Sequence, residues 1–348
     1  MASRSAGRKA VFAPSLYHHH LMDATRQELA YDGGDVRAWQ RKLRKRLREM
    51  VGHLDGPRGP LKVRTLWRRE HKLGVIEKIV FTSEPYADVP AFVCLPEGVK
   101  PPYPWFICLQ GHSTGMHNSI AVDRDDNRKP IQVDGDRDFG LGCMARGVAA
   151  LCIEQRAFGE RGETVQKQRS QHPCQDAAMH ALQLGHTLMG ERLWDVDRGI
   201  DYLATRGDVD MKRLGVIGNS GGGTISVFAA ALLPRIRMAM PSCFFCTWRG
   251  GIMSIYHCAD NYVPGLWRVA ECGDVMGLFA PRPVVIVAGK GDDIFPLAGV
   301  RKAFRDLKRI YTAGGAGDKC HLVVGPEGHR FYADLGWAKM LPELRRLG

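Results

Sequence analysis

The chain has 348 residues, of which 45% are hydrophobic and 25% are charged, and its formal net charge is +12. Such a chain can bury a large core, and its Gly and Pro residues are spread along it, which excludes a low-complexity protein. The amino end up to Pro14 is small and basic and holds no apolar stretch of signal-peptide or membrane-span length, so we expect a cytoplasmic protein without a membrane partner.

The first predicted element is a basic helix over residues 37–48. Trp39, Leu43 and Leu47 recur there at helical spacing, while Lys and Arg fill most of the other positions. We place this helix in a helical arm over residues 1–73 and interpret its basic face as a solvated surface or a contact with a second copy of the chain. Nucleic-acid binding would need stacking aromatic residues or a known binding module beside the charge, so we expect no nucleic-acid partner.

The rest of the chain, residues 74–348, alternates strands and helices. Two strands that form an antiparallel edge are predicted at residues 74–83 and 88–95. Parallel strands are predicted at residues 105–110, 147–153, 214–217, 236–240, 283–288 and 320–324. Helices are predicted at residues 138–146, 188–205, 221–233, 297–311 and 331–344. This alternation predicts an α/β fold, with a mostly parallel sheet, helices on both faces, and ligands at the carboxyl ends of the strands.

A sharp turn with a serine at its apex connects the predicted strand at 214–217 to the helix that follows. The turn reads Gly218-Asn219-Ser220-Gly221-Gly222. Such a turn forces its central residue into strained backbone geometry and leaves no room for side chains on either side, so glycine is required there. Ser220 is therefore predicted to be an exposed nucleophile.

A serine hydroxyl needs a base to take its proton and an acid to orient that base. The buried strand at 283–288 is followed by Asp292 and Asp293, either of which is a candidate acid. The last strand leads into a loop that carries His329, the candidate base. Because all these residues follow carboxyl ends of predicted strands, we expect them to meet at one edge of the sheet.

From about Val75 to its end, the chain resembles the α/β-hydrolase superfamily, and within it esterases similar to acetyl xylan esterases and dienelactone hydrolases. The family turn Gly-x-x-Asp-x-x-x-Pro matches at Asp292 and selects it over Asp293. The family's first oxyanion donor lies in a His-Gly-x loop, which here has Gln110 in place of the histidine. The resemblance therefore implies that the backbone N–H groups of His112 and Gly221 form the oxyanion hole.

Two insertions follow strands of the predicted sheet. Residues 154–161 resemble a turn common in these esterases, and we interpret Arg156 as a structural residue that bonds neighbouring loops, with a substrate contact as the alternative. Residues 243–271 are rich in aromatic side chains, and they form either a cap that walls the pocket or an ordinarily packed excursion. Ten cysteines, including Cys243 and Cys246, are interpreted as small buried hydrophobic residues in a reducing compartment.

These residues predict two-step acyl transfer to and from Ser220, chemistry that requires no metal or organic cofactor. The expected substrate is a small-molecule ester with a small acyl group, such as acetyl on a sugar. A thioesterase or a lactone hydrolase would use the same triad. A peptidase and a non-catalytic binding protein are the less favoured alternatives.

Overall fold

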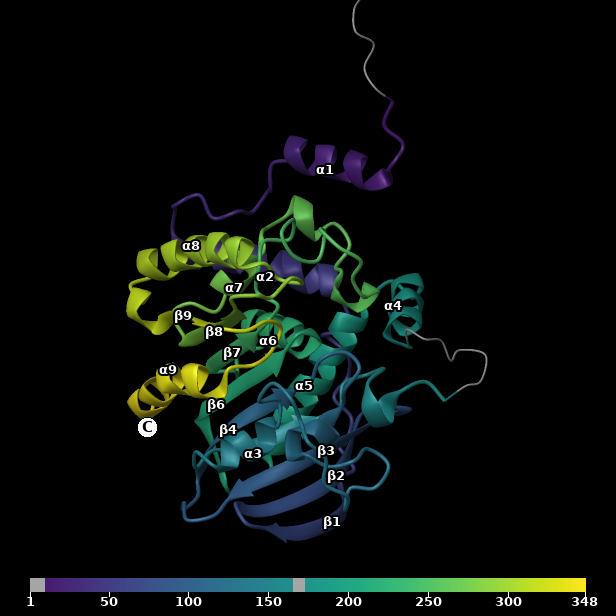
Figure 1. The fold of residues 1–348 in the computed structure, drawn as a ribbon, viewed down its shortest axis with the longest axis vertical. Helices are drawn as coiled ribbons and strands as arrows, with labels where there is room; N and C mark the ends of the chain where they lie inside the picture. The colour runs from purple at the N-terminus through teal and green to yellow at the C-terminus, as the bar shows by residue number, and fades with distance from the viewer. Residues whose placement is uncertain (1–9, 165–172) are drawn as a thin grey trace, which may run out of the picture.

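The computed structural model describes residues 10–164 and 173–348, and within them one nine-stranded sheet has the order β1-β2-β3-β5-β4-β6-β7-β8-β9 (Figure 1). The strands are β1 (Arg64–His71), β2 (Gly74–Glu84), β3 (Ala87–Pro96), β4 (Tyr103–Leu109), β5 (Ala149–Ile153), β6 (Val209–Asn219), β7 (Met238–Ser242), β8 (Val284–Gly289) and β9 (Cys320–Gly325). The pairs among β1, β2, β3 and β5 are antiparallel, whereas the pairs from β5 through β4 to β9 are parallel. The predicted mostly parallel sheet with an antiparallel amino-terminal edge is confirmed.

The helices cover both faces of this sheet. They are α1 (Pro14–Ala24), α2 (Val36–Val51), α3 (Phe139–Met144), α4 (Pro173–Gln183), α5 (Leu188–Ala204), α6 (Gly221–Leu232), α7 (Cys272–Gly277), α8 (Leu297–Ala313) and α9 (Ala333–Arg346). Side chains of β4 alternate between two cores, because successive residues of a strand point to opposite faces. Trp105 and Ile107 pack in the core that α2, α5, α6, α7 and α8 cover, and Phe106 and Cys108 in the core that α3 and α9 cover.

Strand β1 lies inside the range that we assigned to a helical arm, so the sheet begins earlier than predicted. Its sequence, Arg-Thr-Leu-Trp-Arg-Arg-Glu-His, contains four charged residues and no clear alternation of apolar and polar side chains. An edge strand can carry such a sequence because only one of its sides pairs with a neighbour, and charge on an edge opposes further pairing. The hydrophobic pattern therefore did not reveal it.

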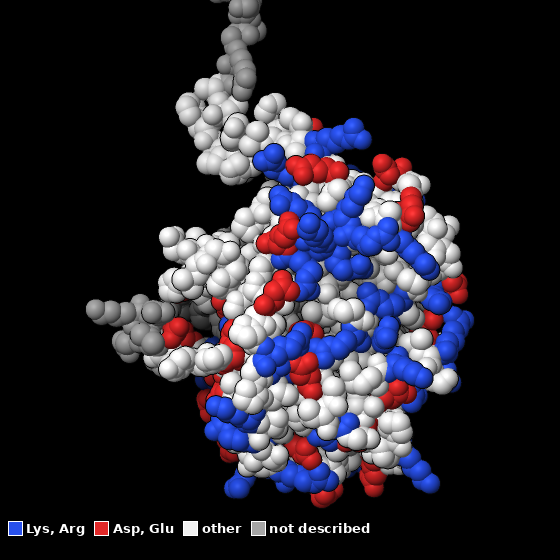
Figure 2. Space-filling view, turned by 180° about the vertical axis from the view of Figure 1, so that it is seen from behind, with Lys and Arg blue, Asp and Glu red and all other residues white. Residues whose placement is uncertain are grey.

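Helix α2 is the predicted basic amphipathic helix, and it belongs to the packed body of the protein. Leu43, Leu47 and Val51 are fully buried in the core, and the Gln40 side chain donates hydrogen bonds to the carbonyl groups of Gly277 and Ala280 at 2.9 Å. Its outward positions carry exposed Lys and Arg residues. Lys and Arg side chains gather on the back face of the molecule (Figure 2), whereas α1 lies at the end opposite β1 (Figure 1). The predicted contact of this region with a second copy stays a prediction.

The cysteines differ from expectation in one respect. Eight are free and buried, as predicted, but Cys174 and Cys258 form a disulfide. The fold makes this pair because α4 packs beside the segment 243–271, although 84 residues separate the two sulfurs in sequence. Within the described residues, every helix is too short or too polar to cross a lipid bilayer.

Candidate active site

Ser220 occupies the sharp turn between β6 and α6 that the sequence predicts. Its backbone has φ 56° and ψ −121°, a conformation that non-glycine residues rarely adopt. Neighbouring backbone leaves no space for side chains in the turn: a Cβ atom at Gly222 would lie 2.0 Å from the carbonyl oxygen of Leu109, and one at Gly218 would lie 2.4 Å from that of Gly222. The close approach of β4 to the turn therefore requires glycine at both positions, and it presents Ser220 to the cavity described below.

His329 and Asp292 are joined by a hydrogen bond. Nδ1 of His329, in the loop after β9, lies 2.9 Å from Oδ2 of Asp292, in the loop after β8. The other carboxylate oxygen accepts the backbone N–H groups of Ile294 and Phe295 at 3.0 and 3.1 Å. Asp293, the alternative acid of the sequence analysis, is exposed. The geometry thus brings together the pair that the family turn selected.

The surroundings keep Asp292 ionised and hold the His329 ring in place. Burial raises the pKa of the Asp292 carboxyl, but the hydrogen bond and charge of His329 and the N–H of Phe295 more than offset this effect, so the net pKa is lowered. The Phe295 ring stacks on the His329 ring with a centroid separation of 5.9 Å. An ionised carboxylate only accepts hydrogen bonds, so Nδ1 of His329 donates and Nε2 is the ring nitrogen that can accept a proton.

Among the hydrogen bonds of the described residues, none joins the Ser220 hydroxyl to His329, so the structure connects two of the three predicted residues directly. The third residue, Ser220, is connected to the loop of His329 by hydrogen bonds through β7. The N–H of Ser220 donates to the carbonyl of Ser242 at 3.0 Å, and the Ser242 hydroxyl lies 3.5 Å from the carbonyl of Arg330, next to His329. In structures without substrate, catalytic hydrogen bonds are often long and tighten only when substrate binds.

The loop after β4 passes directly over the serine turn. A Cβ atom at Gly111 would lie 3.0 Å from Cβ of Ser220, which places the adjacent residue, His112, beside the nucleophile. Gly221 is the first residue of α6, where an N–H group has no acceptor within the helix. The Gln110 side chain is buried and donates to Ser119 and to the carbonyl of Arg137 at 2.8 and 2.7 Å, so it holds the loop and does not itself face the cavity.

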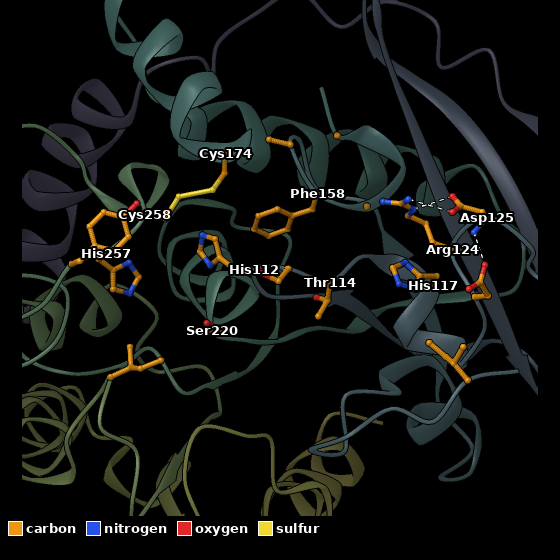
Figure 3. A pocket seen from close by; sticks show the side chains of 18 of the residues that line it. His112, Thr114, His117, Arg124, Asp125, Phe158, Cys174, Ser220, His257 and Cys258 are labelled. Atoms are coloured by element: carbon orange, nitrogen blue, oxygen red, sulfur yellow. Dashed lines mark hydrogen bonds and ion pairs between the residues drawn. A yellow bond between two sulfur atoms is a disulfide. The ribbon is translucent and has the colours of Figure 1, made fainter. Parts of the chain in front are cut away.

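A second histidine–aspartate pair lies beside the serine turn, and no sequence pattern indicates it. Nε2 of His112 lies 3.0 Å from both carboxylate oxygens of Asp260, and the His112 ring covers Gly221 closely enough to contact a Cβ atom there at 2.9 Å. In Figure 3 the His112 ring lies between Ser220 and Phe158, whose ring centroid is 5.0 Å away. The two residues are 148 positions apart and belong to no motif, so no signal in a single sequence pairs them.

Asp260 is fully buried, and the positive charge of Arg192 balances its negative charge. The guanidinium of Arg192 contacts the carboxylate at 2.5 Å, and both side chains are at most 1% exposed. Burial raises the pKa of Asp260, but the charges and hydrogen bonds of Arg192 and His112 outweigh burial and lower the pKa to about 2. An ionised Asp260 therefore anchors the His112 ring.

A cavity of about 720 Å³ opens beside these residues. Most of its lining comes from the loop after β4, the turn after β5 and the tip of the segment 243–271, and Cys174, Ser220 and Ile294 complete it. Its lining residues include His112, Ser220, Phe158 and His257 at one side and Arg124 with Asp125 at the other (Figure 3).

One part of the aromatic segment 243–271 forms a wall of the cavity, and another part packs in the core, so each of the two predicted alternatives applies to part of it. Ile255, Tyr256 and His257 line the cavity, whereas Phe244 and Trp248 are buried in the core. His257 is neutral over most of the pH range, because burial and the nearby charge of His112 lower its pKa to about 4. Within 243–271, only the tip of the segment forms a wall of the cavity.

Arg156 has the structural role that we favoured. Its guanidinium bonds both carboxylate oxygens of Asp195 at 2.9 Å, Glu191 at 3.1 Å and Glu84 at 2.5 Å, and it does not line the cavity. The turn after β5 is thereby fixed to α5 and to the end of β2. Arg161 adds a further bond to Asp195 at 2.6 Å.

Two groups of side chains in the described residues offer enough ligand atoms for a metal ion. Cys243, Asp292 and His329 form the first, and His112, Cys174, Cys258 and Asp260 form the second. In each group the ligand atoms lie within 4.8 Å of one another.

Comparison with known proteins agrees with this architecture. The sequence model of the Abhydrolase family matches residues 3–308, and the chain therefore belongs to this family. It is 26% identical over 289 residues to a Bacillus subtilis protein named as a hydrolase, YtaP. The aligned region covers 82% of this chain and 92% of that protein.

Solved structures share the fold. A Bacteroides fragilis protein named as an acetyl xylan esterase superposes with a TM-score of 0.77 at 17% identity, over 100% of this chain and 97% of that one. A glucuronoyl esterase from Solibacter usitatus superposes with a TM-score of 0.61 at 16% identity, over 92% of this chain and 97% of that one. The predicted membership in the α/β-hydrolase superfamily is confirmed.

Proposed function

We propose that this protein is a serine hydrolase that cleaves carboxylic esters through an acyl-enzyme. The observation that carries the proposal is the buried Asp292 carboxylate bonded to Nδ1 of His329, at the same sheet edge as the strained Ser220. This arrangement leaves Nε2 of His329 as the proton acceptor for a nucleophile. The family and the names of the structural neighbours support the same chemistry.

In the first step, Nε2 of His329 takes the proton of Ser220 as Oγ bonds to the ester carbonyl carbon. Asp292 holds the imidazole in the required tautomer and stabilises its cationic form. The tetrahedral intermediate collapses with cleavage of the bond to the alcohol oxygen, which takes the proton from Nε2. Water then attacks the acyl-enzyme by the same route, and it releases the acid and regenerates the serine.

The negative charge on the carbonyl oxygen is received by the backbone N–H groups of His112 and Gly221. Gly221 begins α6, so the helix dipole adds a partial positive charge at this point. The bond between His112 and Asp260 fixes the ring of the first donor residue, and this fixes the backbone of the loop after β4. Such preorganised donors each contribute roughly 10²–10³ in rate in related sites.

For the substrate we propose a small acyl group, such as acetyl, on a sugar or a related alcohol. The cavity is much larger than an acetyl group and carries polar side chains at the side far from Ser220, including His117, Arg124 and Asp125 (Figure 3). These groups suit the hydroxyls of a polar alcohol better than a long hydrocarbon chain. The named acetyl xylan esterases among the structural neighbours support this choice.

A panel of esters tests the proposal. We expect turnover of p-nitrophenyl acetate and of acetylated xylo-oligosaccharides, with kcat/KM falling as the acyl chain lengthens. A methyl glucuronate ester, a lactone and an acyl thioester complete the panel. Greater kcat/KM for any of these three than for the acetylated sugars would contradict the substrate class, and turnover that persists in Ser220→Ala would contradict the mechanism.

A further inference from the structure

Four side chains with metal-binding donor atoms meet at the wall of the cavity. The Sγ atoms of Cys174 and Cys258, a ring nitrogen of His112 and a carboxylate oxygen of Asp260 all lie within 4.8 Å of one another. Cys174 comes from α4, His112 from the loop after β4, and the other two from the segment 243–271. Figure 3 shows the two sulfurs directly above the His112 ring.

The two cysteines form a disulfide here, so their ligand chemistry depends on reduction. A thiol or phosphine reductant supplies two electrons, the S–S bond breaks, and two protons complete the two thiols. Each thiol loses its proton when its sulfur binds a metal ion, so metal binding releases two protons. The same two sulfurs can therefore serve as a disulfide or as a pair of thiolate ligands, but not as both.

We propose that reduction of the Cys174–Cys258 disulfide creates a zinc site whose ligands are these two thiolates, His112 and Asp260. Two thiolates, an imidazole and a carboxylate are ligand types that Zn²⁺ takes in tetrahedral sites. The site goes beyond ester hydrolysis, and its test reads metal binding and not turnover. Failure of the proposed hydrolase function would leave it untouched.

The spacing of the donor atoms suits this geometry. With Zn–S near 2.3 Å and Zn–N or Zn–O near 2.0 Å, the donor atoms of a tetrahedral site lie roughly 3.3–3.8 Å apart. Nε2 of His112 and the carboxylate oxygens of Asp260 are already 3.0 Å apart. All four donor atoms lie within 4.8 Å of one another, so the remaining donors need to move by only about 1 Å to reach tetrahedral spacing.

Arg192 supplies the charge and the outer hydrogen bond that such a site needs. It contacts Oδ2 of Asp260 at 2.5 Å. Oδ1 accepts a hydrogen bond from the Asn261 side-chain amide at 3.0 Å and keeps a second lone pair for a metal ion. The other nitrogens of Arg192 donate to the carbonyl of Arg156 at 3.1 and 2.7 Å, which fixes its position. Two thiolates, one carboxylate and Zn²⁺ sum to one negative charge, which the buried guanidinium neutralises. Outer partners of this kind orient metal ligands.

Cobalt(II) titration of the full-length protein tests the proposal, because Co²⁺ reports thiolate ligands and tetrahedral geometry in its absorption spectrum. The protein is reduced with a phosphine under anaerobic conditions and titrated, and Zn²⁺ is then added to displace the cobalt. We expect thiolate-to-cobalt charge-transfer bands and tetrahedral d–d bands that saturate at one ion per chain. Protein with the disulfide intact should show neither.

Ligand variants locate the ion. Cys174→Ser and Cys258→Ser should each weaken cobalt binding by at least about 10-fold and reduce the charge-transfer band. Cys320→Ser removes a buried thiol outside the group and should leave the spectrum unchanged. Cys243→Ser distinguishes the other candidate group, Cys243 with Asp292 and His329. Circular dichroism and a melting curve establish that each variant is folded.

Several outcomes would overturn the proposal. Unchanged cobalt spectra in folded Cys174→Ser and Cys258→Ser would do so. Loss of the spectrum in Cys243→Ser alone would assign the ion to the other group. Equal binding before and after reduction would show that the disulfide does not control the site, and the absence of any thiolate band in the reduced protein would show that no such site forms.

Discussion

The Nδ1 atom of His329 lies 2.9 Å from Oδ2 of Asp292, across the ends of two neighbouring parallel strands. Asp292 is buried, whereas Asp293, the next residue, is exposed. Orientation of the imidazole therefore depends on one carboxylate of the two.

Replacing each aspartate in turn should show which one is the catalytic acid. We expect Asp292→Asn to lower kcat for a p-nitrophenyl ester by about 10⁴, because the amide favours the wrong histidine tautomer. Asp293→Asn is the matched control and should change kcat less than about 3-fold, because its side chain is exposed and His329 bonds Asp292 instead. The reverse order of effects, measured at saturating substrate, would identify Asp293 as the acid.

The close packing at the serine turn predicts that two Gly→Ala substitutions differ sharply in stability and turnover. Gly222→Ala would place a methyl carbon 2.0 Å from the carbonyl oxygen of Leu109, so the turn must distort or the strand must shift. We expect a loss of about 1–3 kcal/mol in the free energy of unfolding, with loss of turnover as well. Gly207→Ala, where a Cβ atom meets nothing within 4 Å, is the control and should leave both nearly unchanged. Urea denaturation compares them, and equal stability of the two variants would contradict the packing argument.

The buried Arg156 network predicts a large cost for its removal. Burial raises the pKa of Asp195, but the charges of Arg161 and Arg156 outweigh this and hold the pKa well below its usual range. Among the described residues, Arg156→Met leaves Arg161 as the remaining ion-pair partner of Asp195, whose side chain is 1% exposed. We expect the free energy of unfolding to fall by about 3–5 kcal/mol.

The control for this variant is Arg64→Met, which removes an ion pair with Asp88 in which both side chains are more than half exposed. Its cost should be below about 1 kcal/mol. Similar costs for the two variants in denaturant titrations would mean that the Arg156 network does not carry the stability we assign to it.

Glu154 makes stability depend on pH. Burial raises the pKa of its carboxyl to about 7, although the backbone N–H groups of Glu160 and Met116 lower it. The folded protein therefore holds a proton that the unfolded chain releases near pH 4.5, so the free energy of unfolding falls as pH rises from about 4.5 through about 7. The full difference is on the order of 3 kcal/mol.

Glu154→Gln should remove this contribution. Glu271, whose pKa burial raises to about 7, and His257, whose pKa burial lowers to about 4, titrate in both proteins, so the two proteins differ by the Glu154 contribution alone. We expect the variant to lose on the order of 3 kcal/mol less stability than the native protein between about pH 5 and about pH 8. Denaturant titrations at the two pH values measure it. An unchanged decline would show that Glu154 does not titrate in this range.

The sequence predicted those parts of the protein whose pattern depends on local burial. The parallel strands have apolar runs because both their faces are covered. The serine turn has a glycine cluster because a Cβ atom at Gly218 or Gly222 would lie within about 2–3 Å of backbone atoms. The acid was selected by its distance from Pro296, a local feature of one turn.

The features that the sequence did not predict depend on contacts between distant loops. His112 and Asp260 meet because the loop after β4 and the segment 243–271 lie against each other, and the Cys174–Cys258 disulfide forms because α4 packs beside the same segment. Strand β1 was missed for a different reason, because its charged edge sequence carries no period. Hydrophobic periodicity reports which side of an element is covered but not which side chain of another loop lies against it.

The most direct test of the central claim is the labelling of the nucleophile. A fluorophosphonate reacts covalently with a serine only when a base activates it, and mass spectrometry of the digested protein locates the label. We predict a single label on Ser220 in the native protein, and labelling slowed by orders of magnitude in a folded His329→Ala variant. A label on another residue, or equally fast labelling of Ser220 without His329, would contradict the account.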